Sequence, residues 1–165
     1  MSNPLPILIQ TLRDELQQYG EMLALLDQQQ EFVVSRAADE MLQTSSAIQA
    51  QTVTVHAARD RREECRRELA VTLGLQADAP FAKIIPELPL DYRPLVSALV
   101  DENNTLLVRI QQRARQNHLL LSRSVALMQR FMESLMPALR STVYNGNGGL
   151  IPGATPLRPL YEGVG

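Results

Sequence analysis

Hydrophobic residues recur every three or four positions along most of this 165-residue chain, and this spacing predicts three long helices. The helices are expected at about residues 5–31, 35–73 and 91–136. Gly74 followed by Leu75 is suited to end the second helix, because glycine adopts the left-handed conformation common after a helix C-terminus and the next residue supplies an apolar contact.

Four prolines lie between the second and third predicted helices, at positions 80, 86, 89 and 94. Proline removes a backbone donor, so residues 76–94 are expected to form a connection, with one short helical turn at 81–85 held to the bundle by its apolar side chains. The third helix then runs back along the second.

The sequence predicts an all-α fold, a three-helix antiparallel bundle or helical hairpin with long second and third helices. Residues 1–140 are expected to form this domain, and residues 141–165 a flexible tail rich in proline and glycine.

The third predicted helix carries two sets of apolar residues. The first set is expected to form a seam for partner helices and comprises Leu95, Leu99, Leu106, Ile110, Leu120, Leu127, Phe131 and Leu135. The second set begins near Leu121 and comprises Leu121, Val125, Met128, Met132 and Leu139, with Met136 on the same side. One face cannot use both sets. The second set therefore packs against the first helix or a second copy of the chain, or it binds another helix, for which methionines are well suited because they adapt to different partners.

Two polar residues, Arg113 and Asn117, occupy positions of the seam where apolar residues are expected. A buried polar layer that fixes the helix register is one interpretation. A crossing of the seam by the polar side of the helix is the other, and the sequence does not choose between them.

Composition narrows the classes of function. The net charge of −2 gives no basic surface for nucleic acid. The single cysteine, Cys65, excludes an internal disulfide and is expected to be a partly buried apolar residue in a reducing compartment. The chain shows neither a signal peptide nor a membrane-spanning run, so a cytoplasmic location without membrane insertion is expected.

No catalytic or metal-binding constellation is recognisable in the sequence. His56 and His118 are isolated from each other and from Cys65, so we expect neither an enzyme nor a metal or other cofactor.

A charged run at residues 59–68 alternates in sign at helical spacing, which is typical of an exposed helix with weak ion pairs. The alternative is a site for an anionic partner, formed by Arg59, Arg62 and Arg66 along one side of the helix.

The chain resembles the FlgN family of flagellar type III export chaperones in three features. These are the Gln/Glu-rich helical hairpins, Asn117 before the apolar run 119–121, and Pro137 followed by Thr142-Val-Tyr-Asn-Gly-Asn-Gly148. The resemblance covers nearly the whole chain in architecture and is specific at the residue level at about residues 117–149.

The resemblance implies a small cytosolic helical protein that binds the hook-filament junction proteins FlgK and FlgL before secretion. Binding would use the C-terminal part of the third helix and would hold a C-terminal amphipathic segment of each client. The implied client-binding residues are Leu121, Val125, Met128, Met132, Leu135, Met136 and Leu139. Tyr144 with Gly148 matches a Tyr-x-x-x-Gly pattern that the family uses to dock on the export gate component FlhA.

This sequence departs from the family in a longer tail, where Leu157, Leu160 and Tyr161 could supply further anchors. Two alternatives to this function remain. One is a structural or regulatory helical bundle that forms a homo-oligomer through the same apolar residues. The other is an export chaperone for a different flagellar client.

Overall fold

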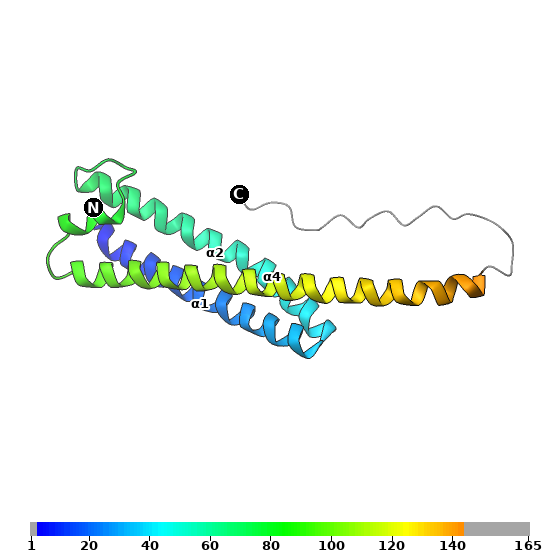
Figure 1. Ribbon diagram of the computed structural model, residues 1–165. Helices are drawn as coiled ribbons and strands as arrows, with labels where there is room; N and C mark the ends of the chain where they lie inside the picture. Colours follow the sequence, from blue (N-terminus) through cyan, green and yellow to red (C-terminus); the bar gives the residue numbers. More distant parts are fainter. Residues whose placement is uncertain (1–2, 144–165) are drawn as a thin grey trace. The chain divides into compact units, whose positions relative to one another are not determined.

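The computed structural model describes the backbone of residues 3–143 and the side chains of residues 3–136. Over these residues the chain is helical and contains no strand, which confirms the all-α prediction. The elements in chain order are α1 (Pro4–Ser35), α2 (Ala38–Thr72), the short α3 (Phe81–Ile84), the 3-10 turn η1 (Ile85–Glu87) and α4 (Arg93–Val143) (Figure 1). Helix α4 is continuous through Arg113 and Asn117.

The chain divides into two compact units, Met1–Ser124 and Val125–Gly165. The first unit contains α1, α2, α3, η1 and the beginning of α4. The second contains the rest of α4, and each unit is described by itself below. The domain boundary expected at residue 140 stays a prediction.

Helices α1 and α2 pack against each other in antiparallel directions (Figure 1). Near the middle of the pair, the Gln51 side chain donates to the Gln18 backbone carbonyl at 3.1 Å. Near the α1–α2 turn, the Gln29 side chain donates to the Ser45 hydroxyl at 3.2 Å. Polar side chains thus take a large part in holding this pair together, consistent with the few buried apolar residues of α2.

The apolar core of the first unit lies where α1 begins, α2 ends and α4 begins. The connection contributes Ala79, Ile84 and Leu88 to this core, so its apolar side chains hold it against the helices. The other buried members are Leu5, Leu8, Ile9, Leu12, Leu69, Ala70, Val96 and Leu99.

Two buried asparagines join α4 to α1. The Asn103 Nδ2 donates to the Leu12 carbonyl at 3.0 Å, and the Asn117 Nδ2 donates to the Leu26 carbonyl at 2.7 Å. Fourteen residues separate the two donors in α4, and fourteen separate the two acceptors in α1. The two helices are therefore parallel and keep one register across two heptads.

Position 117 is thus a buried polar position, at 1% exposure, which supports the polar-layer interpretation. Arg113 is half-buried at its edge and pairs with Asp27 at 2.7 Å. At the start of α4 the predicted seam is wrong by one residue, because Val96 is buried whereas Leu95 is 37% exposed. Val96 belongs to the core that also contains Ile84 and Leu88 of the connection, and spacing along α4 could not reveal this contact.

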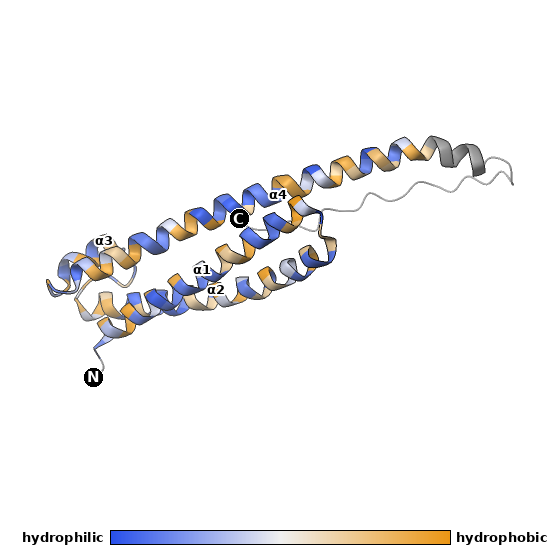
Figure 2. Ribbon diagram, turned by 90° about the horizontal axis from the view of Figure 1, so that it is seen from below, coloured by the Kyte–Doolittle hydropathy of each residue, from blue (hydrophilic) through white to orange (hydrophobic). Residues whose placement is uncertain are grey.

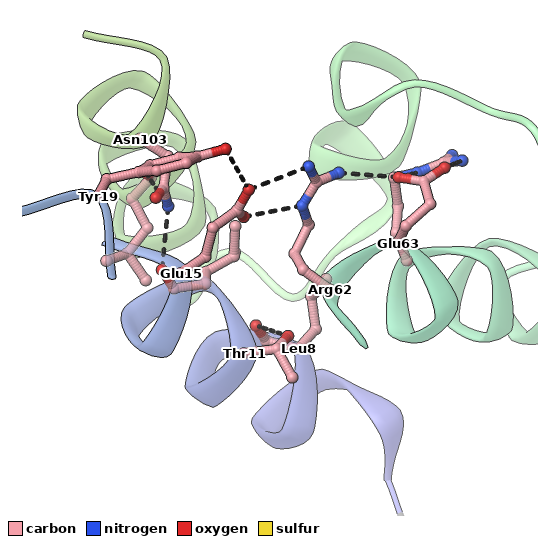
Figure 3. Close-up of polar contacts among 10 residues, drawn as sticks. Leu8, Thr11, Glu15, Tyr19, Arg62, Glu63 and Asn103 are labelled. Atoms are coloured by element: carbon pink, nitrogen blue, oxygen red, sulfur yellow. Dashed lines mark hydrogen bonds and ion pairs between the residues drawn. The ribbon is translucent and has the colours of Figure 1, made fainter. Parts of the chain in front are cut away.

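A buried carboxylate, Glu15 of α1, organises the charged part of α2 (Figure 3). Glu15 is 2% exposed and accepts hydrogen bonds from the Tyr19 hydroxyl at 2.8 Å and from the Arg62 Nε at 2.9 Å. Arg62 also donates to Glu63 at 2.8 Å, and its guanidinium lies 5.9 Å from the centre of the Phe81 ring. These contacts join α1, α2 and α3 through one guanidinium group.

This environment shifts the pKa of several groups. Burial raises the pKa of Tyr19, and the hydrogen bond to Glu15 adds to the shift. Burial alone would lower the pKa of Arg62, but its hydrogen bond to Glu15 and the Glu15 charge outweigh burial and raise it. The hydrogen bond from Arg66 lowers the pKa of Glu63. Each shift keeps the group in the protonation state that the network requires at neutral pH.

The expectation of an exposed run with weak ion pairs is wrong for Arg62 and Arg66. Arg62 pairs with the buried Glu15, and Arg66 is itself buried and donates to Glu63 and to the Ala79 carbonyl of the connection. The local spacing in α2 did not reveal a partner 47 residues away in α1.

The C-terminal ends of α1 and α2 have the same backbone geometry. After α2, Gly74 has φ +75°, and the Leu75 N–H donates to the Ala70 carbonyl at 2.9 Å. After α1, Arg36 has φ +57°, and the Ala37 N–H donates to the Phe32 carbonyl at 3.0 Å. Both ends are Schellman motifs. The sequence predicted the first end from its glycine, but it gave no signal for the second.

We expect Arg36→Gly to raise the free energy of unfolding by about 0.5–1 kcal/mol, because glycine adopts a positive φ without the steric cost borne by arginine. Gly74→Ala is the matched opposite change and should lower it by about 1 kcal/mol, since a Cβ there meets nothing within 4 Å and the effect is confined to the backbone. Urea denaturation measures both. A loss of stability in Arg36→Gly would contradict the assignment.

We expect Glu15→Gln to lower the free energy of unfolding by about 3 kcal/mol, because the largely enclosed Arg62 loses its buried counter-ion and keeps only the partly exposed Glu63. Glu64→Gln, an exposed position of α2, is the control and should change stability by less than about 0.5 kcal/mol. The measurement is urea denaturation at pH 7. A loss below about 1 kcal/mol for Glu15→Gln would show that this pair contributes no more than a surface ion pair.

Candidate functional site

The part of α4 that follows Ser124 carries an exposed set of large apolar side chains. Seven of them are between 45% and 66% exposed. We call this set the apolar face of α4, and it consists of Val125, Leu127, Met128, Phe131, Met132, Leu135 and Met136. Figure 2 shows hydrophobic residues recurring along α4 as far as its side chains are described.

Helical geometry places all seven residues on one side of α4. At about 100° per residue they cover roughly half of the helix circumference. Gln129, Arg130 and Glu133 fall on the opposite half. An arc of this width exceeds what one helix–helix contact of the coiled-coil type requires. The face therefore has room for a partner with broad apolar contact.

Most of the residues predicted to bind a client belong to this face. Val125, Met128, Met132, Leu135 and Met136 are exposed together on it.

Three other predictions concern residues at or beyond the ends of the face. Leu121 is half-buried and belongs to the first unit. Leu139 lies in α4, but its side chain is outside the described residues, and so is the whole of Tyr144.

The predicted seam is wrong beyond residue 121, because Leu127 and Phe131 are exposed. These residues belong to the second unit. The repeat of apolar residues in α4 continues through both units, so periodicity alone could not show which part of the helix is buried.

The sequence also suggested an anionic-partner site at Arg59, Arg62 and Arg66, and the structure contradicts it. Arg62 and Arg66 are already bound to carboxylates and to a backbone carbonyl. An incoming anion would have to displace Glu15, which is buried beside Arg62.

A cleft of about 510 Å³ in the first unit lies between α1, α2, α3 and α4, next to Glu15 and Tyr19. The Tyr19 hydroxyl and the Glu15 carboxylate bind each other, and Arg62 binds the carboxylate, so neither is available as an acid, a base or a nucleophile. Burial raises the pKa of the half-buried Cys65 thiol, which makes it a weaker nucleophile. Among the described residues, no group of three or more His, Cys, Asp or Glu side chains is placed to hold a metal ion.

Within residues 3–143, no helix combines the length and the apolar character needed to cross a membrane. Contiguous exposed apolar side chains are typical of surfaces that bind other molecules, and the apolar face of α4 is a surface of this kind.

Comparison with known proteins identifies the family. The FlgN protein family matches residues 1–150, which include every described helix and the segment at 117–149 that carries the resemblance noted from the sequence. No curated protein and no solved structure matched the chain. The matched family is one of flagellar export chaperones. This chain belongs to the FlgN family.

Proposed function

We propose that this protein is a cytoplasmic flagellar export chaperone that binds the hook-filament junction proteins FlgK and FlgL. It prevents their premature association and delivers them to the type III export gate. The observation that carries the proposal is the apolar face of α4, exposed in a chain that belongs to a chaperone family.

The client segment is proposed to be an amphipathic helix from the C-terminal end of each client. Burying seven half-exposed side chains contributes about 1 kcal/mol each, or roughly 7 kcal/mol before the costs of association and of ordering the client. Apolar surface of the client adds to this sum. We therefore expect affinities in about the micromolar range, tight enough for capture and weak enough for release at the gate.

Three methionines, Met128, Met132 and Met136, lie one helical turn apart along the face. Their unbranched side chains adapt to partners of different shape, which suits one chaperone with two clients. Leu121 and Leu139 are proposed to extend the site at its two ends. Tyr144 is proposed to dock on FlhA, and residues 141–165 to form a tail separate from the helical domain 1–140. The proposed activity is binding without turnover, and it requires no cofactor.

We expect C-terminal segments of FlgK and FlgL from the same organism to bind the full chain saturably in isothermal titration calorimetry. Met132→Glu should weaken this binding at least about 10-fold, because a carboxylate would be desolvated in an apolar contact. The free energy of unfolding should change by less than about 0.5 kcal/mol, since Met132 is exposed in the free protein.

Val53→Glu is the matched control. Val53 is an exposed apolar residue of α2 and is no part of the apolar face, so this variant should bind both segments like the unchanged chain. Sedimentation analysis of the same samples tests the homo-oligomer. Absence of binding to both segments, together with an oligomer that Met132→Glu dissociates, would overturn the proposal in favour of a self-associating bundle.

A further inference from the structure

The apolar face of α4 belongs to the second unit, Val125–Gly165, together with the 22 residues that follow α4. A contiguous apolar surface of this kind favours association with any apolar segment held near it. The segment nearest in sequence is the chain's own C-terminal stretch, residues 144–165.

This stretch has the composition of an apolar ligand. It contains two charged residues, Arg158 and Glu162. Its larger apolar side chains are Tyr144, Leu150, Ile151, Leu157, Leu160, Tyr161 and Val164. Low charge and several large apolar side chains suit contact with the face better than contact with the polar half of α4.

The stretch is also long enough to span the face. Residues 125–136 extend about 17 Å along α4 at 1.5 Å per residue. Residues 150–161 would extend about 34 Å in the polyproline conformation at 3.1 Å per residue. Asn145-Gly-Asn-Gly-Gly149 allows a reversal of direction directly after the helix, because glycine accepts the positive φ values of tight turns.

We propose that residues 150–161 lie along the apolar face of α4 in the free protein and occupy it until another ligand displaces them. Prolines at 152, 156 and 159 oppose a helix and favour an extended strand, which places Leu157, Leu160 and Tyr161 at different points along the face. The occupant is thus an extended segment of the same chain.

Tethering makes even a weak contact effective. A short tether gives an effective concentration of a few millimolar, so an intrinsic dissociation constant of about 1 mM leaves the face covered roughly five-sixths of the time. An external ligand then binds about 6-fold more weakly than to an uncovered face. The contact itself is independent of the proposed function, whereas its role in regulating client capture rests on that function.

Methionine methyl NMR tests the contact directly. A nitroxide label is attached at Glu162→Cys in a Cys65→Ser background, in a chain labelled with ¹³C at the methionine methyl groups. Met128, Met132 and Met136 should lose more than half of their signal intensity, whereas Met22, which is buried in the first unit, should not. Replacing Leu157, Leu160 and Tyr161 with serine in the same labelled chain should restore the three signals.

Equal signal loss with and without the serine substitutions would overturn the contact, because a freely moving label would produce it as well. A mixture of two samples tests for contact between chains. One sample carries the nitroxide without ¹³C, and the other carries ¹³C without the nitroxide. Signal loss in this mixture would show that the face binds a second copy, and it would overturn the contact within one chain.

Client titration separates this inference from the proposed function. The serine-substituted chain should bind the FlgK and FlgL segments about 6-fold more tightly than the unchanged chain. Equal affinities would overturn displacement by the client. If neither chain binds a client segment, the proposed function fails, and the NMR result alone decides whether the tail covers the face.

Discussion

The register between α1 and α4 is the constraint on which the rest of the first unit depends. Asn103 and Asn117 each donate a side-chain N–H to a backbone carbonyl of α1, and their spacing matches the spacing of the carbonyls. Sliding α4 by one turn would leave two buried amides without these acceptors, at about 1–3 kcal/mol each. The two Oδ1 atoms already lack a protein partner among the described residues. These asparagines therefore lower the stability of the first unit, but they specify the register of α1 against α4.

The stabilising contacts of the first unit change in character along its helices. Apolar side chains of α1, α2, the connection and α4 meet at one end, around Leu8, Ile84 and Val96, which are fully buried. Toward the α1–α2 turn, polar pairs such as Gln29 with Ser45 and Arg113 with Asp27 take over. Exposed polar pairs contribute less than buried apolar contacts. The turn end is accordingly expected to open more readily than the core end.

The sequence predicted the features that depend on the local pattern of residues. It did not predict the features that depend on a partner in another helix. Helical periodicity placed the three long helices, and Gly74 marked the end of α2. The buried role of Arg62 depends on Glu15 in another helix, which no spacing within α2 could reveal. The exposure of Leu127 and Phe131 likewise could not be predicted from the repeat, because the apolar spacing is the same in the buried and the exposed parts of α4. Arg36 takes a positive φ at a position where composition gave no sign of it.

Three of the six methionines lie together on the apolar face of α4, where they contact water whenever the face is unoccupied. Thioethers in such positions are open to oxidants, and each sulfoxide would replace an apolar, adaptable contact with a polar, chiral one. Met22 is buried and would be spared for longer. Oxidation would therefore make the proposed binding surface more polar well before it unfolded the helices, and methionine sulfoxide reductases would reverse this change.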